Sequence, residues 1–356
     1  MRSIFMASTP LHILNSIAIA GKQDGEHHLL IIDQPDIHKN PYFQLLQEWP
    51  TSPFQSVHIY PGRVRKVRAK LALRKQLFHS LEHHCQEIKP THIYIGNDRR
   101  IEFQYSMHIC KTMGLATTGI YMDEGTFTYV GRAASASFSD RVIDNLIKKI
   151  TYGRWWDNPP TVGGSGWIQD VYAAFPQWVV PALQQKRLHN LQDCYHHNGF
   201  IDDFSTRFLQ LYAFDAKRLA GIDVLITTPH ESLINRIPDY KSTLKGVIQS
   251  LISSGKNVAI KYHPRNLDPD ALGVVEMAGV VQIPSAIPFE MLCPLMQGIT
   301  LVGDLSSTLI NASWMTSGIR IIALKVTGPS EFDALFEKLA VPMIAPADLP
   351  EELAKA

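Results

Sequence analysis

Short apolar runs separated by helix-length segments recur in both halves of this chain of 356 residues. Such alternation predicts parallel strands in a sheet, with the intervening helices packed on its two faces. In the first half we expect strands at residues 4–7, 28–32, 57–60, 92–95 and 117–122, and helices at 10–21 (capped by Ser8 or Thr9), 66–88 and 100–113. In the second half we expect strands at 224–227, 258–262, 280–283, 299–302 and 319–324, and helices at 241–253 and 307–316. The fold class is therefore α/β.

The stretch from residue 131 to about 200 interrupts this alternation. Tryptophan, proline and glycine gather there, which indicates loops between two regular halves: Trp155, Trp156, Pro159, Pro160, Gly163, Gly164, Gly166 and Trp167. A chain of this length also exceeds what one compact core usually holds. We expect two Rossmann-like domains, residues 1–185 with an irregular segment over 131–185, and residues 186–356.

Charge and cysteine content narrow the class of protein. The chain has 34 Lys and Arg against 33 Asp and Glu, so it has no general attraction for nucleic acid, and we expect no nucleic-acid partner. Its four cysteines lack CxxC spacing, which favours a reducing cytoplasm over a disulfide framework or a zinc site. No apolar run approaches the roughly 20 residues that span a bilayer. Ser8, Thr9 and Pro10 also interrupt the first apolar stretch, against a secretion signal.

Two adjacent carboxylates follow the strand expected at 117–122, in the sequence Asp123-Glu124-Gly125. Open α/β sheets place their ligands at the carboxyl ends of their strands, so a carboxylate there is a candidate general base. Gly125 permits a tight turn. The alternative is a capped turn whose acids are merely solvated.

A histidine follows the strand at 258–262, in the sequence Lys261-Tyr262-His263-Pro264. Pro264 disfavours helical backbone at His263 and holds it at the tip of the strand. An imidazole there can donate a proton or a hydrogen bond to a phosphate oxygen. A structural histidine at a strand end is the alternative.

A third motif, Gly303-Asp304-Leu305-Ser306-Ser307-Thr308, joins a strand to a helix. Hydroxyls and backbone N–H groups at a helix N-terminus form a phosphate site, although the same residues also make an ordinary helix cap. Glu290, in Ile287-Pro288-Phe289-Glu290, is a weaker candidate that can accept hydrogen bonds from ribose hydroxyls.

In this order, the motifs resemble those of the bacterial GT-B sialyltransferases, which are D/E-D/E-G, HP and S-S/T. The chain is similar to the capsular polysialyltransferases and the lipooligosaccharide sialyltransferases, which also open with a strand and a TPL turn, here Thr9-Pro10-Leu11. The resemblance implies a GT-B fold of two Rossmann-like domains that face a central cleft. It implies that the acceptor binds the N-terminal domain and the nucleotide binds the C-terminal domain.

The resemblance also implies roles for these residues. Glu124 would be the base that deprotonates the acceptor hydroxyl, with Asp123 as second choice, and His263 would act on the departing phosphate of CMP. Phosphate and ribose would be held by the remaining motif residues: Ser306, Ser307, Thr308, Gly303, Pro264 and Glu290. The implied reaction is inverting transfer of sialic acid from CMP-sialic acid to a hydroxyl of a capsule or lipooligosaccharide glycan. We expect no cofactor and no metal, because a single phosphate leaves and no DxD motif suited to a cation accompanies it.

Other activities remain open at this stage. One is a different GT-B transferase, for Kdo or another nonulosonic acid, or a CDP-polyol phosphotransferase, which also uses an HP and a D-x-S-S cap. Another is a non-catalytic glycan-binding protein of the same fold. The linkage and the acceptor are also open.

Two stretches are candidates for a peripheral contact at the cytoplasmic face of the inner membrane. Seven basic residues lie between 63 and 75 with no acid among them, and they suit an anionic glycan, acidic lipid headgroups or a solvated helix face. Basic and aromatic residues also mix from Leu146 to Trp156, which suits a membrane surface or packing between domains. The paired histidines at 27–28, 83–84 and 196–197 are expected on the surface.

Overall fold

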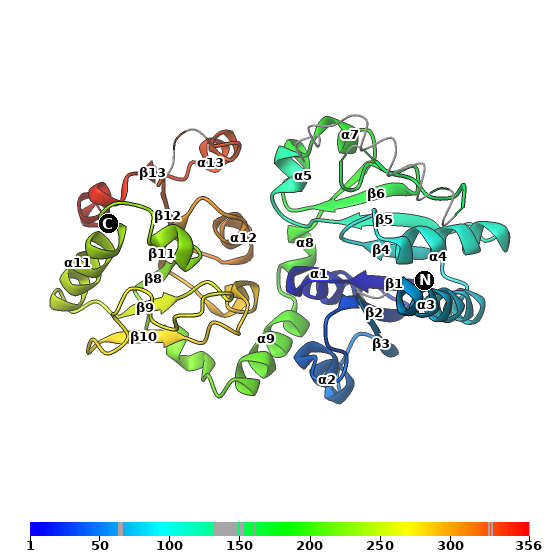
Figure 1. The fold of residues 1–356 in the computed structure, drawn as a ribbon, viewed down its shortest axis with the longest axis horizontal. Helices are drawn as coiled ribbons and strands as arrows, with labels where there is room; N and C mark the ends of the chain where they lie inside the picture. The colour runs from blue at the N-terminus through cyan, green and yellow to red at the C-terminus, as the bar shows by residue number, and fades with distance from the viewer. Residues whose placement is uncertain are drawn as a thin grey trace. The chain divides into compact units, whose positions relative to one another are not determined.

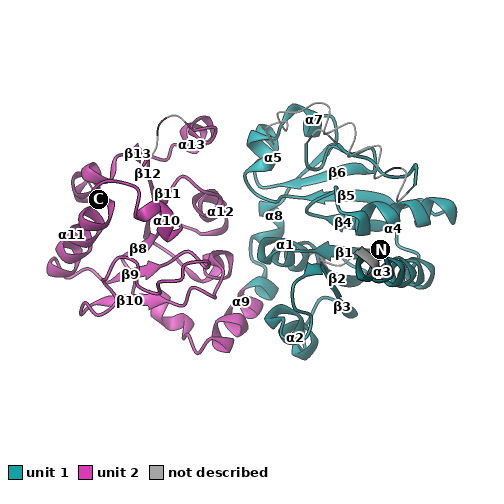
Figure 2. Ribbon diagram, viewed as in Figure 1, with its two compact units in different colours: residues 1–201 teal, residues 202–356 magenta. Residues whose placement is uncertain are grey.

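The computed structural model describes residues 1–62, 67–131, 149, 153–159, 161–326, 328 and 330–355. These residues form two compact units, Met1–Ile201 and Asp202–Ala356 (Figures 1 and 2). Each unit contains one parallel sheet with helices around it. The α/β class and the two Rossmann-like halves expected from the sequence are confirmed.

The first unit is built on a seven-stranded sheet in the order β3-β2-β1-β4-β5-β6-β7. Its strands are β1 (Arg2–Ala7), β2 (Glu26–Gln34), β3 (Ser56–Pro61), β4 (His92–Ile95), β5 (Thr118–Met122), β6 (Ile168–Ala173) and β7 (Arg187–Asn190). The central strand β1 is covered on both faces, and Ile4, Phe5 and Met6 have no exposed surface. Burial on both faces explains why this strand reads as a continuous apolar run.

The helices of the first unit connect these strands. They are α1 (Pro10–Ala20), α2 (Pro41–Glu48), α3 (Val67–Ile88), α4 (Ile101–Thr112), α5 (Phe127–Val130), α7 (Pro181–Gln184) and α8 (Gln192–Tyr195), with a 3-10 turn at Pro176–Trp178. The sequence rules for helix starts hold at α1. Thr9 is its N-cap and accepts a hydrogen bond from the His12 N–H at 3.2 Å, and Pro10 opens the first turn.

Strand β6 lies inside residues 131–185, which we expected to be irregular, and corrects that expectation there, while β7 lies just beyond them. Both strands carry polar residues, and β7 is a short edge strand, so neither shows the apolar run that marks the central strands. An ion pair joins them, because Arg187 donates to both carboxylate oxygens of Asp170 at 2.5 and 2.9 Å. Since β7 belongs to the first sheet, the units divide after Ile201 and not between residues 185 and 186.

The second unit is built on a six-stranded parallel sheet in the order β10-β9-β8-β11-β12-β13. Its strands are β8 (Val224–Thr227), β9 (Val258–Lys261), β10 (Val280–Ile283), β11 (Thr300–Asp304), β12 (Arg320–Leu324) and β13 (Met343–Ile344). Its helices are α10 (Glu231–Ile234), α11 (Tyr240–Ser253), α12 (Ser307–Met315), α13 (Asp333–Lys338) and α14 (Leu349–Ala354). Short 3-10 turns lie at Ala216–Leu219, Phe289–Met291, Cys293–Leu295 and Pro346–Asp348, and α9 (Gly199–Leu211) carries the chain from one unit to the other.

The paired histidines are not all surface residues, contrary to expectation. His27, His28 and His84 are buried in the first unit. His84 accepts or donates a hydrogen bond with the Tyr60 hydroxyl at 2.6 Å, and His28 bonds the Ser56 hydroxyl at 2.8 Å. The sequence does not reveal these positions, because a polar imidazole can be buried where it finds a hydrogen-bond partner, at the start of β2 for His27 and His28 and on α3 for His84.

The two stretches considered for membrane contact lie only partly within the described residues. Residues 63–66, 146–148 and 150–152 fall outside them, as does the side chain of Arg68. Within them, Arg74 pairs with the buried Glu102 at 3.1 Å, and the Trp156 side chain is only 3% exposed. Neither side chain is placed to enter a headgroup layer. Among the described helices, none is both long and apolar enough to cross a bilayer.

Candidate active site

Both sheets share one order of strands, and this order defines where ligands bind. In each, the first strand of the unit lies at the centre with the second and third on one side and the fourth onward on the other. All strands run parallel, but the order in which they are added to the sheet reverses between the first and fourth strands, and open α/β sheets bind ligands at the carboxyl ends beside that point. The relevant strands are β1 and β4 in the first unit, and β8 and β11 in the second.

Asp123 follows β5 in the first unit, and both of its carboxylate oxygens accept hydrogen bonds from neighbouring groups of the same unit. Its Oδ1 accepts hydrogen bonds from the Gly125 N–H and the Thr128 hydroxyl, both at 2.8 Å. Its Oδ2 accepts from the Ala174 N–H at 3.0 Å and from the Tyr129 hydroxyl. Burial raises the pKa of Asp123, and these four bonds oppose the shift. The carboxylate therefore anchors the turn.

Glu124 is the more accessible member of the acid pair. Its side chain is half-buried, whereas Asp123 is 2% exposed. The turn that presents Glu124 needs glycine at the next position, since Gly125 has a φ of +98°. The charge of Glu124 also contributes, after burial, to raising the pKa of the neighbouring Tyr121.

Helix α1 braces this acidic turn from the central gap of the first sheet. Asn15 donates to the Asp123 carbonyl at 2.8 Å and accepts from the Tyr195 hydroxyl at 2.7 Å. His12, three residues earlier, is buried, and its Nδ1 lies 3.3 Å from the Ser8 hydroxyl. Burial, and then the charge of Arg100, lower the pKa of His12 to about 4, so the ring is neutral near pH 7. Sequence reasoning did not select either residue.

His263 lies at the carboxyl end of β9 in the second unit, half-buried, with the exposed Pro264 after it. Its Nδ1 accepts a hydrogen bond from the Arg265 N–H at 3.2 Å. The neutral ring therefore carries its proton on Nε2. Burial lowers the pKa of His263, and the charges of His230, Arg265 and Lys261 lower it further.

A second histidine, His230, faces His263 from the end of β8. The two rings meet edge to face with 5.4 Å between their centroids. Its Nδ1 accepts from the Ser232 N–H at 3.2 Å, so its neutral ring also carries the proton on Nε2. Sequence reasoning missed His230, although Thr228-Pro229 before it parallels the Thr9-Pro10 that follows β1.

The motif at the end of β11 places a helix N-terminus at the same edge of the second sheet. Ser306 is the N-cap of α12, and its hydroxyl makes no capping bond to that helix. Ser307 is exposed and Thr308 half-buried in the first turn. Gly303 has to lack a side chain, because a Cβ there would lie 2.2 Å from the Thr227 hydroxyl on β8.

Two buried polar atoms beside this helix have no hydrogen-bond partner among the described residues. They are Oδ2 of Asp304 and Oγ1 of Thr228. Val302 pairs with Ile226, so Asp304 and Thr228 lie side by side two residues further on. The other oxygen of Asp304 accepts from the Tyr240 hydroxyl at 3.1 Å, and burial raises the pKa of Asp304 to about 7.

Glu290 lies close to α12 and to the end of β9. Its carboxylate accepts from the Asn311 amide at 3.2 Å. Its charge also partly offsets the burial of Lys261, whose pKa burial lowers to about 8. The second unit thus gathers the side chains of His263, Ser306, Thr308 and Glu290 around the carboxyl ends of its strands.

Acidic residues at DxD spacing do occur in the second unit, at Asp268 and Asp270. Asp270 accepts from the Tyr262 hydroxyl at 2.6 Å and from the N–H groups of Val274 and Val275. Asp268 accepts from the Asp270 N–H at 2.9 Å. Within the described part of the chain, no three His, Cys, Asp or Glu side chains converge to hold a metal ion.

These two sheets, with their ligand-binding edges, define a GT-B fold of two Rossmann-like units. A UDP-GlcNAc 2-epimerase from Methanocaldococcus jannaschii has a similar structure, with 11% identity, a TM-score of 0.61, and coverage of 100% of this chain and 92% of that one. A Neisseria meningitidis UDP-GlcNAc 2-epimerase bound to UDP-GlcNAc has 12% identity and a TM-score of 0.51, over 100% and 91% of the chains. Arabidopsis thaliana UGT89C1 complexed with UDP has 10% identity and a TM-score of 0.53, over 100% and 90%.

The sequence itself matches the alpha-2,8-polysialyltransferase (POLYST) family over residues 3–325. The chain belongs to that family. It is therefore a sialyltransferase, a glycosyltransferase that uses a nucleotide-sugar donor and a glycan acceptor. No curated protein sequence matches it.

Proposed function

We propose that this sialyltransferase uses CMP-sialic acid as its donor and inverts the anomeric centre without a metal ion. The acceptor is a hydroxyl of an acidic cell-surface glycan, of the capsule or lipooligosaccharide type. Glu124 is the general base, His263 the general acid, and Ser306, Ser307 and Thr308 bind the phosphate. Glu290 binds ribose. The enzyme works in the cytoplasm, at the inner face of the membrane where such glycans are assembled.

The saturation of Asp123 is the observation that carries the choice of base. A carboxylate that already accepts four hydrogen bonds has no lone pair left in a good direction for a substrate hydroxyl. Glu124 leaves the same turn and is half-buried rather than enclosed. The two acids therefore have different roles: Asp123 fixes the backbone of the turn, and Glu124 acts as the base.

The second unit supplies the features that suit a departing nucleoside monophosphate. Backbone N–H groups and the uncommitted Ser306 hydroxyl at α12 attract a phosphate. Buried polar groups are nearly always hydrogen-bonded, so the unpaired oxygens of Asp304 and Thr228 favour a bound polar ligand at this edge. A pKa raised to about 7 leaves Asp304 partly protonated near neutral pH, which reduces its repulsion of a phosphate.

The reaction then proceeds by one displacement at the anomeric carbon. Glu124 takes the proton of the acceptor hydroxyl as its oxygen attacks from the face opposite the phosphate. The bond from the anomeric carbon to the phosphate oxygen breaks, and its electron pair remains on that oxygen. His263, protonated on both ring nitrogens beside the bound phosphate, gives its Nε2 proton to that phosphate and is left as a neutral imidazole. Each proton transfer contributes on the order of 10²–10⁴-fold.

A donor panel tests this proposal. The purified full chain is incubated with CMP-sialic acid, CMP-Kdo or CDP-glycerol and a set of galactoside and sialoside acceptors, with and without EDTA. Products are identified by mass spectrometry, and anomeric configuration by NMR. We expect transfer from CMP-sialic acid alone, with inversion, undiminished by the chelator.

Each other outcome overturns a stated part of the proposal. Transfer from CMP-Kdo or CDP-glycerol but not from CMP-sialic acid replaces the donor. Loss of activity in EDTA with recovery in magnesium removes the metal-free mechanism. Glycan binding without turnover of any donor leaves a non-catalytic protein of the same fold.

A further inference from the structure

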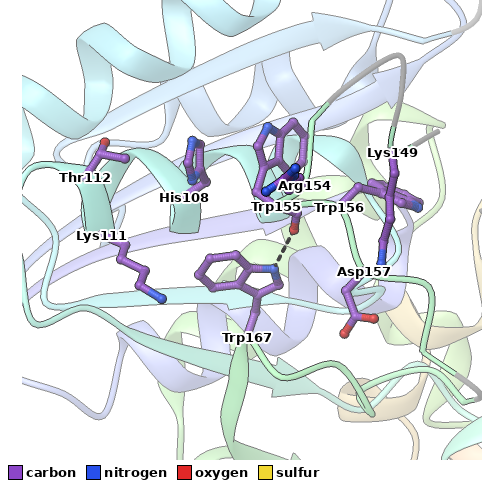
Figure 3. A pocket seen from close by; sticks show the side chains of 9 residues that line it. All are labelled: His108, Lys111, Thr112, Lys149, Arg154, Trp155, Trp156, Asp157 and Trp167. Atoms are coloured by element: carbon purple, nitrogen blue, oxygen red, sulfur yellow. Dashed lines mark hydrogen bonds between the residues drawn. The ribbon is translucent and has the colours of Figure 1, made fainter. Parts of the chain in front are cut away.

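A pocket of about 660 Å³ lies in the first unit, between the last turns of α4 and the segments that lead into β6 (Figure 3). His108, Lys111 and Thr112 of α4 form one wall. Residues around three tryptophans, Trp155, Trp156 and Trp167, form the rest of its described lining. None of these residues has a part in the mechanism above.

The pocket is remote from the acidic turn within the same unit. Helix α4 starts after the carboxyl end of β4 and runs back along the sheet, so its last residues lie toward the amino ends of the strands. Trp167 directly precedes β6, and its carbonyl lies against Gly119 near the start of β5. Asp123 and Glu124 follow the other end of that strand, on the order of 15 Å away.

Aromatic side chains give the pocket a firm apolar wall. Trp155 packs on Tyr105 with ring centroids 5.6 Å apart, and stacks with His108 at 5.9 Å. The Trp167 indole N–H donates to the Trp155 carbonyl at 3.2 Å, which locks the two tryptophans together. Both indoles are only half-buried. Such rigid, amphipathic surfaces suit a ligand that has a flat apolar face and polar edges.

Positive charge surrounds this wall. Lys111, Lys149 and Arg154 are exposed among the described lining residues. The Lys111 Nζ lies 5.8 Å from the centre of the Trp167 ring. Asp157 is the acid of this lining, and its Oδ2 accepts the Gly166 N–H at 3.2 Å. An anionic group that entered here would meet three cations and one acid that is already hydrogen-bonded.

We propose that this pocket is a second binding site for the acidic glycan acceptor, separate from the site of transfer. A carboxylate-bearing sugar packs its C–H face against Trp155 and Trp167 and pairs its carboxylate with Lys111 and Arg154. This inference rests on the proposed acceptor class. It makes the enzyme favour long acidic chains, because such chains gain a second attachment that a short acceptor cannot reach.

Equilibrium binding tests the site directly. Binding of 2,8-linked oligosialic acid to the intact protein is measured by titration calorimetry and tryptophan emission. Loss of two exposed ion pairs in Lys111→Ala with Arg154→Ala should weaken binding about 3- to 10-fold. The matched control, Lys217→Ala with Lys245→Ala, removes the same charge from exposed positions in the second unit and should bind like wild type.

Kinetics separates this site from the site of transfer. KM for a long sialoside acceptor should rise by a similar factor in the pocket variant, while kcat and KM for a short acceptor and for the donor stay unchanged. Trp167→Phe, which keeps an aromatic ring but loses the hydrogen bond to the Trp155 carbonyl, should raise KM for the long acceptor while kcat and KM for the short acceptor stay unchanged. If CMP-sialic acid is not the donor, the binding measurement still reports on the pocket.

Three results would overturn the proposal. The first is equal oligosialic acid affinity in the pocket variant and wild type. The second is an equal loss of affinity in the control variant, which assigns the effect to net charge. The third is weaker binding to acidic phospholipid vesicles with unchanged oligosialic acid binding, which makes the pocket a membrane contact.

Discussion

The protonation state of His263 depends on whether the donor is bound. Burial and three neighbouring positive groups lower its pKa below 6.5 in the free protein. A phosphate beside the ring replaces that repulsion with attraction and raises the pKa again. The imidazole therefore becomes a competent acid when the donor arrives, whereas the free enzyme carries it mostly neutral at pH 7.

This coupling gives the first prediction. His263→Ala should lower kcat for CMP-sialic acid by about 10²-fold or more, because the leaving phosphate loses its proton donor. In the wild type, kcat/KM should fall as pH rises through a value below 6.5, and the corresponding fall in kcat should lie at higher pH. The variant should lose both limbs. Replacing the exposed His38 by Ala serves as control, and near wild-type turnover in His263→Ala would remove this residue from the mechanism.

The two acids of the Asp123-Glu124 turn should fail in different ways. Glu124→Gln should lose transfer by at least about 10²-fold while it keeps the melting temperature and donor affinity of the wild type. Asp123→Asn should lose stability, because its amide NH₂ would face an N–H or O–H group that now donates a hydrogen bond to the carboxylate, and two donors cannot pair. A cost of about 2–4 kcal/mol follows for a buried network of this kind.

Thermal unfolding and initial rates, measured on both variants, distinguish the two roles. If Asp123→Asn is folded and inactive and Glu124→Gln is active, then Asp123 is the base. If both retain transfer, the acidic turn has no catalytic role.

At single positions, the sequence indicated the motifs but not the partners of each side chain. Asp123 and Glu124 look alike in sequence, and only the hydrogen bonds from Thr128, Tyr129 and Ala174 tell them apart. His230 escaped attention for another reason. Its closeness to His263 depends on β8 and β9 being neighbours in the sheet, and strand order is not visible in a local motif.

Among the secondary-structure elements, the central strands were predictable and the edge strands were not. Strands β1, β8 and β9 are enclosed on both faces and read as unbroken apolar runs. Strand β7 has the sequence Arg187-Leu188-His189-Asn190 and no fully buried residue. An edge strand of this kind is held by backbone pairing and by the Asp170–Arg187 ion pair, which periodicity does not reveal.

The packing of β8 against β11 gives a prediction at the scale of these elements. A methyl group at Gly303 would sit 2.2 Å from the Thr227 hydroxyl, so Gly303→Ala should push the two strands apart. Overpacking of this kind costs about 1–3 kcal/mol. Because α12 follows directly, the variant should also bind CMP more weakly than wild type.

Gly221→Ala is the matched control, since a Cβ at Gly221 would have no atom within 4 Å. Chemical denaturation and CMP titration of both variants check the prediction. A Gly303→Ala protein with wild-type stability and CMP affinity would show that the strands tolerate the methyl group and that the close approach is irrelevant to the phosphate site.

The molecule as a whole has a net charge of +1, but burial shifts the pKa values of its buried histidines and of Asp304 in opposite directions. In the first unit, burial lowers the pKa of His12 and of His84 from 6.5 to about 4. The unfolded chain therefore binds more protons between those values, and stability falls as pH falls from 6.5 toward 4. In the second unit, burial raises the pKa of Asp304 from 3.8 to about 7. There the folded state binds more protons, and stability rises as pH falls through that range.

A fall in pH should therefore destabilise the first unit, whereas protonation of Asp304 should stabilise the second. Hydrogen exchange followed by mass spectrometry measures the stability of the two cores separately. His84 is the residue to replace, because its hydrogen bond to the Tyr60 hydroxyl at 2.6 Å is a defined contact in the first core. Between pH 6.5 and 5, proton uptake by His84 in the unfolded chain should lower the stability of the wild type by about 1–2 kcal/mol, a loss that His84→Gln does not share. His79→Gln, an exposed position on the same helix, should keep the wild-type pH dependence. If His84→Gln and His79→Gln lose hydrogen-exchange protection equally on acidification, protonation of His84 does not control the acid stability of the first unit.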